Sequence, residues 1–203
     1  MSLPINLNRR LLLVSSVLGL ALAGPLAARA QPVMTEGQAF ERRLTLAGSE
    51  LQLNGTGVRA VAWFKGYAAG LYLRTPSRNA AQALAQAGPK RLQLRMLQDV
   101  PAAEFVKAFR KGVERNSTAA ELPQLAERMA VFEALVGALG QVRKGDVVNL
   151  DLEPGRGTVF SVNGTLRGEA IAGEDFFAAL LRSFVGDRPY DSKLKAGLLA
   201  GAV

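Results

Sequence analysis

One charged side chain, Arg59, lies in a segment that is otherwise apolar or small. The segment runs from Asn54 to Arg74, and Arg59 stands between Val58 and Ala60. A buried guanidinium is costly in free energy unless an anion or hydrogen-bond acceptors meet it. Arg59 is therefore a candidate for an anion-binding site. The alternative is that it lies at the rim of a sheet, with its stem buried and its head in water.

Two residue types are missing from the sequence, and their absence excludes whole classes of chemistry. The 203 residues include no His and no Cys. Catalytic nucleophiles that depend on His, metal or haem sites with His or Cys ligands, and disulfides are therefore excluded. Acidic residues such as Asp99 and Glu104 show no paired spacing typical of acid–base work. We expect neither a metal nor a cofactor.

The charge of the chain is mildly basic and gives no sign of nucleic-acid binding. Lys and Arg number 25, Asp and Glu 17, for a net charge of +8. Basic residues come at most in adjacent pairs and do not cluster on one predicted element. A nucleic-acid interface needs such clustering, so we expect a solvated surface without a nucleic-acid partner.

The N-terminal 30 residues have the pattern of a cleavable signal peptide. A positive start at Asn8-Arg9-Arg10 precedes an apolar run from Leu11 to Ala23, and Ala28-Arg29-Ala30 is a suitable cleavage site. The run is shorter than the about 20 residues of a membrane span. We expect a periplasmic or secreted protein without a stable membrane span, exported by the Sec or the twin-arginine route. An uncleaved anchor is the alternative.

Residues 31–43 are expected to form a flexible leader, and residues 44–203 a single domain. Its apolar residues alternate with period two in some stretches and follow helical spacing in others. Trp63 is expected in the core, and Lys65-Gly66 is expected to form a turn. Strands are predicted at 44–53 (as a hairpin), 58–64, 67–73, 92–96, 147–152, 158–162 and 165–169, and helices after Asn79, from Pro101, at 119–139, from Gly173 and near 192–199. This order predicts an α+β fold, with an antiparallel sheet and helices gathered on one side.

Three stretches together resemble the chalcone isomerase family. The first is Gly57-Val58-Arg59 followed by the apolar segment Lys65–Leu73, and the second is the strand and helix from Arg95 to Asn116. The third is Asp175–Leu181, with the terminal helix after it. The resemblance extends over nearly all of residues 31–203 and is closest to the exported bacterial branch. It implies an open-faced β-sandwich with a ligand cleft between the sheet and the helices.

The resemblance also implies roles for particular residues. In the enzymes an Arg at the position of Arg59 stabilises the substrate oxyanion, and in the fatty-acid-binding branch it meets the ligand carboxylate. Tyr67 stands where the enzymes have Thr, and Phe105 where they have Tyr. Gly112 replaces an Asn, and Ser183 keeps the late hydroxyl. We therefore expect Arg59, Tyr67, Phe105 and Ser183 to contact the ligand, with Arg59 as the candidate catalytic residue.

Three functions are compatible with these features. The leading hypothesis is an exported protein that binds a small apolar or amphiphilic molecule, of fatty-acid or phenylpropanoid type, with its anionic or phenolic oxygen at Arg59. The first alternative is an isomerase (intramolecular lyase) of the chalcone isomerase type, acting on another substrate. The second alternative is a non-catalytic interaction module of the cell envelope. The unmatched polar positions leave open whether the protein is an enzyme.

Overall fold

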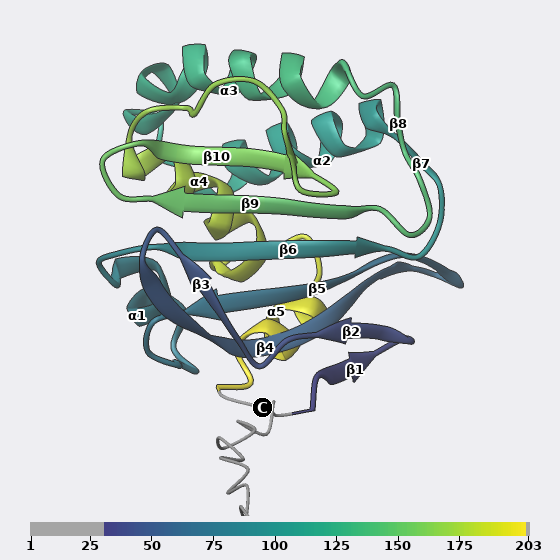
Figure 1. The fold of residues 1–203 in the computed structure, drawn as a ribbon. Helices are drawn as coiled ribbons and strands as arrows, with labels where there is room; N and C mark the ends of the chain where they lie inside the picture. Colours follow the sequence, from purple (N-terminus) through teal and green to yellow (C-terminus); the bar gives the residue numbers. More distant parts are fainter. Residues whose placement is uncertain (1–30, 202–203) are drawn as a thin grey trace, which may run out of the picture.

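A computed structural model describes residues 31–201, which form one sheet of seven strands with helices against it (Figure 1). The predicted signal peptide, residues 1–30, lies outside the described residues. The strand order in the sheet is β11-β10-β9-β6-β5-β4-β3, with every neighbouring pair antiparallel. The strands are β3 (Arg43–Leu46), β4 (Ser49–Val61), β5 (Phe64–Leu73), β6 (Lys90–Met96), β9 (Val147–Glu153), β10 (Gly157–Val162) and β11 (Thr165–Leu166).

The helices lie mainly on one side of this sheet, behind and above it in the view of Figure 1. They are α1 (Ala80–Ala85), α2 (Ala102–Asn116), α3 (Glu121–Gly137), α4 (Glu174–Val185) and α5 (Ser192–Leu198). Two small two-stranded sheets complete the fold: β1 (Val33–Thr35) with β2 (Gln38–Phe40), and β7 (Val100–Pro101) with β8 (Gln141–Val142). The predicted open-faced α+β architecture is confirmed. None of the helices within residues 31–201 is long and apolar enough to cross a membrane.

Strand periodicity divides the buried side chains between the two faces of the sheet. Alternate residues of β5, such as Leu71 and Leu73, pack in the main core between the sheet and the helices. Their neighbours Ala68 and Tyr72 pack in a smaller cluster on the opposite face. Because side chains alternate along a strand, β5 contributes to both clusters and is almost entirely buried. The main core buries the apolar stripes of the three long helices.

The prediction of a flexible leader at residues 31–43 is wrong for most of that segment. Val33–Thr35 and Gln38–Phe40 pair as an antiparallel hairpin, and Arg43 begins β3. Phe40 is fully buried in the smaller cluster, with its ring directly over Gly70 of β5. A Cβ atom at residue 70 would lie only 2.7 Å from that ring, so the missing side chain makes the space for Phe40. The segment is held by this buried aromatic anchor.

The turn between β4 and β5 lies earlier in the chain than predicted. Val61 pairs with Phe64, so Ala62 and Trp63 form the turn in place of Lys65-Gly66. Ala62 takes a φ of 52°, a left-handed conformation typical of two-residue hairpin turns. This position leaves Trp63 90% exposed at the tip, and the prediction that it belongs to the core is wrong.

Glycines allow α5 to approach β4 more closely than side chains would permit. A Cβ atom at Gly55 would lie 2.1 Å from the carbonyl oxygen of Gly197, and one at Gly197 would lie 2.3 Å from that of Thr56. The backbones of the strand and the helix are therefore in direct contact. A Cβ atom at Gly57 would likewise lie 2.8 Å from the carbonyl oxygen of Leu194, so the whole of α5 lies against the strand that carries Arg59.

Candidate functional site

Arg59 and Tyr67 are cross-strand partners at one end of the sheet. They lie opposite each other in the β4–β5 register, and Tyr67 also pairs with Met96 of β6. Directly opposed residues project from the same face of a sheet. Tyr67 and Met96 belong to the main core, so this face is the one covered by helices. A bulge follows immediately between Arg59 and Ala60, where the strand turns outward.

Arg59 uses one of its guanidinium nitrogens in hydrogen bonds with the protein. Its Nη1 donates to Oδ2 of Asp191 and to the backbone oxygen of Ala60, both at 3.3 Å. Within residues 31–201, Nε and Nη2 make no hydrogen bond. The Arg59 side chain is 29% exposed. A guanidinium can bind a carboxylate through two parallel N–H groups, so Nε and Nη2 remain suitable for an anion.

Asp191 has a second, structural role as the N-cap of α5. Its Oδ1 accepts hydrogen bonds from the backbone N–H groups of Lys193 at 2.8 Å and Leu194 at 3.1 Å. Burial alone would raise the pKa of Asp191. The two N–H groups and the Arg59 guanidinium outweigh that effect and hold the pKa below its usual value. Asp191 is therefore a fixed anion, bonded to the helix through one oxygen and to Arg59 through the other.

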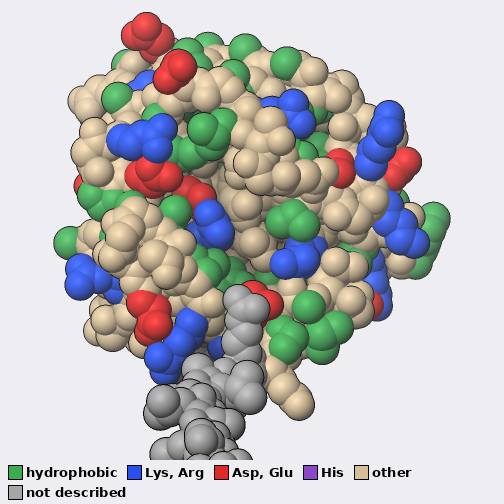
Figure 2. Space-filling model, in the orientation of Figure 1, with side chains coloured by type: hydrophobic (Ala, Val, Ile, Leu, Met, Phe, Trp, Pro, Cys, Tyr) green, Lys and Arg blue, Asp and Glu red, His purple; other side chains and the backbone are tan. Residues whose placement is uncertain are grey.

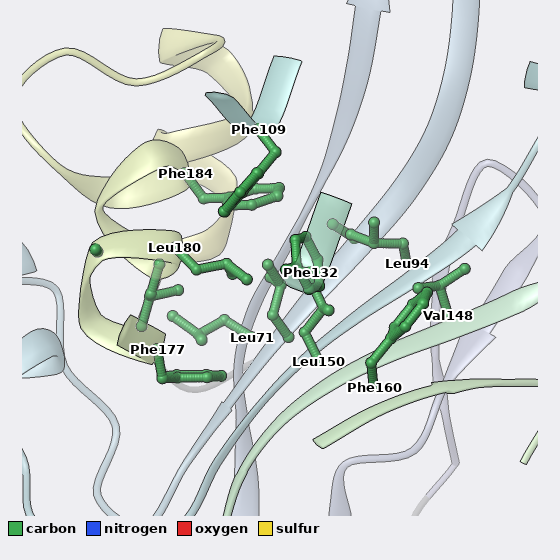
Figure 3. Packing of buried hydrophobic residues seen from close by; sticks show 14 of the residues in the cluster. Leu71, Leu94, Phe109, Phe132, Val148, Leu150, Phe160, Phe177, Leu180 and Phe184 are labelled. Carbon is green, nitrogen blue, oxygen red and sulfur yellow. The ribbon is translucent and has the colours of Figure 1, made fainter. Parts of the chain in front are cut away.

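A cavity of about 370 Å³ opens beside these two residues, within the size range of small-molecule sites. Arg59, Tyr67 and Tyr190 are among the residues that line it. The rest of the wall is mainly apolar, and Figure 3 shows side chains from the helices pointing toward side chains of the sheet. The labelled residues that line the cavity are Phe109, Phe132, Leu180 and Phe184 of the helices and Leu94, Val148, Leu150 and Phe160 of the sheet.

Phe105 lies at the cavity as predicted, and it packs on Tyr67. The two rings are stacked, with centroids 6.1 Å apart and planes 27° from parallel. Phe105 is half-buried, and it offers the ligand an apolar face without a hydrogen-bond donor. The Tyr67 hydroxyl makes no side-chain hydrogen bond with the residues that the structure describes. The pair therefore combines an apolar ring with a phenol available to a ligand oxygen.

Ser183 does not line the cavity. It is completely buried in α4, and its hydroxyl lies 3.4 Å from the backbone oxygen of Ala179. Tyr190 stands between this position and the cavity, and its backbone N–H donates to the Ser183 carbonyl at 3.0 Å. Arg59, Tyr67, Phe105 and Tyr190 therefore line one cavity. Ser183 lies outside it and contacts Tyr190.

Both phenols at the cavity are held in their neutral form. Burial raises the pKa of Tyr67, the nearby Tyr190 raises it further, and the Arg59 cation only partly opposes this. Burial raises the pKa of Tyr190 to about 12, although a hydrogen bond with Ser183 and the cations of Arg115 and Arg59 lower it. A neutral phenol keeps its proton and can donate a hydrogen bond to a ligand oxygen.

These raised pKa values predict a loss of stability in alkaline solution. In the unfolded chain a Tyr loses its proton near pH 10, whereas the folded chain keeps the Tyr190 proton until about pH 12. Above pH 10 the unfolded state therefore binds fewer protons, and the free energy of unfolding falls as the pH rises. Tyr190→Phe should reduce the slope of this fall between pH 10 and 12, measured by urea unfolding. A slope equal to that of the wild type would contradict the assignment.

Sequence reasoning missed two residues of the site, Tyr190 and Asp191. The sequence does not show that Asp191, just before the helix predicted near 192–199, reaches Arg59 across 132 positions. Tyr190 follows Arg188-Pro189 in a connecting segment without periodicity. The one feature of the sequence that could have indicated Tyr190 is that Tyr is rare in it. The chain has only three Tyr, and two of them line the cavity.

Comparisons with known proteins agree on the fold. Residues 32–200 match the model of a family described as chalcone isomerase-like. The fold is similar to the crystal structure of an Arabidopsis thaliana fatty-acid binding protein, with a TM-score of 0.64 and 15% sequence identity. That match covers 83% of this chain and 96% of the plant chain. Curated protein sequences give no match.

The family match runs from β1 to the end of α5 and so includes every residue of the cavity wall. The similarity to the plant structure shows the same arrangement of sheet and helices, and at this identity it shows the fold alone. The chain belongs to the chalcone isomerase-like family.

Proposed function

We propose that the protein, exported as its N-terminal segment predicts, binds a small amphiphile that carries a carboxylate or phenolate. The apolar part of the ligand fills the cavity, and its anionic oxygens meet Nε and Nη2 of Arg59 and the hydroxyl of Tyr67. The observation that supports this most directly is the unengaged edge of the guanidinium beside a neutral phenol at an apolar cavity.

The apolar wall favours an aliphatic or aromatic tail over a sugar or a nucleotide. Residues from the large sheet and from the three long helices converge on the cavity, and most of their side chains have no polar atom. Burial of such a tail is favourable by about 0.8 kcal/mol for each CH₂ group. The similar plant protein is described as a fatty-acid binding protein, which supports a fatty acid as the first ligand to test.

The experiment is a calorimetric titration of residues 31–203 with dodecanoate and with dodecanol, which share a tail and differ in the head group. We expect dodecanoate to bind with a 1:1 stoichiometry and dodecanol to bind at least about ten times more weakly. Mass spectrometry of an extract of the purified protein then identifies any natural ligand. Absence of binding by dodecanoate and by a phenylpropanoid acid would reject the proposal.

Asp191 should weaken this binding, because it competes with the ligand for Arg59. Asp191→Asn removes the negative charge next to Arg59 but keeps a good N-cap, since Asn and Asp cap helices about equally well. We expect the affinity for dodecanoate to rise about three- to ten-fold, because a like charge a few ångströms from the ligand carboxylate is removed. The thermal midpoint should change little. Isothermal titration measures the first effect and calorimetric unfolding the second.

The matched control is Asp175→Asn, at the start of α4. Asp175 also accepts hydrogen bonds from an Arg, Arg128, at 2.6 and 2.7 Å, but it does not line the cavity. The control should leave the affinity for dodecanoate unchanged. Equal affinities in Asp191→Asn and the wild type would show that Asp191 does not compete for the site.

A second function, intramolecular lyase activity on an enone, is supported by one observation. Tyr190 supplies a phenol at the cavity beside Gly112, where the enzymes of the family have an Asn. Arg59 and two neutral phenols form a set of donors suited to a developing oxyanion. Cyclisation of naringenin chalcone above its spontaneous rate, lost in Tyr67→Phe, would support catalysis. A rate equal to the spontaneous one would reject it for this substrate.

A further inference from the structure

The turn between β4 and β5 exposes three large apolar side chains together. Trp63 is 90% exposed, Val61 58% and Phe64 37%, and only Ala62 separates the first two. We call residues 61–64 the hairpin tip. The rings of Trp63 and Phe64 lie edge to face, with centroids 6.4 Å apart. A contiguous exposed apolar group of this kind marks a surface that meets an apolar partner.

The strands hold the hairpin tip out from the body of the fold. Val61 and Phe64 are paired in the antiparallel register, so the tip is the end of the two-stranded β4–β5 ribbon, just beyond the bulge at Arg59 and Ala60. Figure 2 shows hydrophobic side chains projecting at the right-hand edge of the molecule, where this hairpin ends in Figure 1. The tip is therefore the projecting end of the β4–β5 hairpin, with its apolar side chains exposed to solvent.

The hairpin tip also forms part of the entrance to the cavity. Val61 and Phe64 line the cavity together with Arg59 and Gly66. A surface that receives the hairpin tip would thus lie against the opening through which a ligand reaches Arg59. Asp99 and Glu104 also line the cavity.

Exposed basic side chains lie at the same end of the sheet as the hairpin tip. Carboxylates lie there too, because Asp146 and Asp99 accept the backbone N–H groups of Arg143 and Lys144. Lys65 follows the hairpin tip directly and pairs with Glu36 at 2.8 Å. The loop with Arg143 and Lys144 is tied to the same end of the sheet, because Gly145 donates to the backbone oxygen of Met96 at 3.0 Å. Both side chains of the loop are exposed, and neither forms an ion pair within residues 31–201. Figure 2 shows Lys and Arg side chains beside the projecting apolar group.

We propose that the hairpin tip docks on an anionic membrane surface, with Trp63 in the interfacial layer and Lys65, Arg143 and Lys144 near the lipid head groups. Trp prefers the membrane interface, where its ring is buried and its N–H remains hydrated. Each Lys or Arg close to an anionic leaflet adds to the attraction. Docking would place the cavity entrance against the bilayer, so that an amphiphile passes between them. The passage of an amphiphile from the bilayer to the cavity rests on the proposed function. The docking of the hairpin tip on the membrane does not.

Trp63 is the only Trp of the chain and therefore reports its own position. The experiment mixes residues 31–203, which contain the whole described fold, with phospholipid vesicles free of fatty acid. One set is phosphatidylcholine alone, and the other contains phosphatidylglycerol in equal amount. We expect the Trp63 emission to shift to shorter wavelength, and brominated acyl chains to quench it, on the anionic vesicles only. Unshifted, unquenched emission on both sets would overturn the proposal.

Variants separate the apolar and the electrostatic parts of docking, with co-sedimentation as the measurement. Trp63→Ser should lower the partition onto anionic vesicles about ten-fold. Arg143→Gln with Lys144→Gln should lower it about 25-fold at low salt, about five-fold for each charge. The matched control is Val131→Ser on α3, where the side chain is 46% exposed and does not line the cavity. It should bind vesicles as the wild type does.

A titration with dodecanoate in solution keeps this result separate from the proposed function. Vesicle binding that Trp63→Ser leaves unchanged overturns docking by the hairpin tip, whatever the titration gives. Loss of dodecanoate binding with normal quenching by brominated lipids would reject the proposed ligand and leave docking supported. A wild-type protein that binds dodecanoate but no vesicles would overturn docking alone.

Discussion

Arg59→Gln lowers the affinity for dodecanoate about 100-fold and leaves the affinity for dodecanol unchanged. This is the expected result if Nε and Nη2 of Arg59 bind the carboxylate as a pair of charge-assisted hydrogen bonds. Each such bond contributes about 1.5 to 3 kcal/mol, and about 2.8 kcal/mol corresponds to a factor of 100 in Kd. Titration calorimetry of the wild type and the variant with both ligands measures the two changes.

The size of the effect follows from the surroundings of Arg59. The cavity beside it is mainly apolar, so a carboxylate that lost its guanidinium partner would be both desolvated and unpaired. Tyr67 would remain as one neutral donor, which cannot replace a cation. The fold should tolerate the change, because Arg59 meets Asp191 only once, at 3.3 Å, while two backbone N–H groups still bind Asp191.

Two further variants distinguish the geometry of Arg59 from its charge. Arg59→Lys keeps the charge without the planar pair of N–H groups, and we expect an affinity between those of the wild type and Arg59→Gln. Arg95→Gln is the matched control. Arg95 is also an Arg of the central sheet, but its guanidinium lies 5.3 Å from the ring centre of Phe40, on the opposite face. It should bind dodecanoate normally, and a loss equal to that of Arg59→Gln would contradict a specific site.

Local patterns in the sequence were sufficient to predict most of the fold. A helix follows Asn79 as expected, with Asn79 as its N-cap, and the strands predicted at 158–162 and from 165 pair with each other. These signals act within a few residues, where the chemistry of one side chain decides the backbone conformation. The leader was mispredicted because its anchor is a distant contact, Phe40 on Gly70. Trp63 was mispredicted because hydrophobicity was taken as burial, although its place in the turn decides its exposure.

The family resemblance predicted individual residues of the candidate site. It did not predict the residues that two segments distant in the sequence bring together. Arg59, Tyr67 and Phe105, predicted to contact a ligand, all line the cavity, and that contact stays a prediction. Tyr190 lines the cavity and Asp191 meets Arg59, because α5 lies in backbone contact with β4 through glycines at both surfaces. No local pattern encodes that contact. In the sequence, Gly112 replaces a polar Asn of the family's enzymes. In the structure, the ring of Tyr190 occupies the space where a side chain at residue 112 would lie.

Gly112→Asn should therefore destabilise the protein by about 1 to 3 kcal/mol, as expected for overpacking of a filled interior position. A Cβ atom at residue 112 would lie 2.4 to 2.6 Å from atoms of the Tyr190 ring, including its hydroxyl oxygen. The ring would have to leave its edge-to-face contact with Phe184, where the centroids are now 5.0 Å apart. Urea unfolding measures the loss in the free energy of unfolding.

The space is shared by the two residues, so their substitutions should not be additive. Tyr190→Ala alone removes ring contacts with Phe184, and in the double variant the amide side chain introduced by Gly112→Asn can occupy the space that the ring vacates. We expect the double variant to be about 1 to 3 kcal/mol more stable than the sum of the single effects predicts.

Gly137→Asn on α3 is the control, because nothing lies within 4 Å of a Cβ atom there, and it should cost no stability. Additivity of Gly112→Asn and Tyr190→Ala within about 0.5 kcal/mol would show that the ring does not fill the place of the missing side chain. Strong coupling would instead mean that the cavity wall depends on Gly112 and Tyr190 together. An Asn introduced to imitate the family's enzymes would then require a smaller residue at position 190 before its amide could reach the cavity.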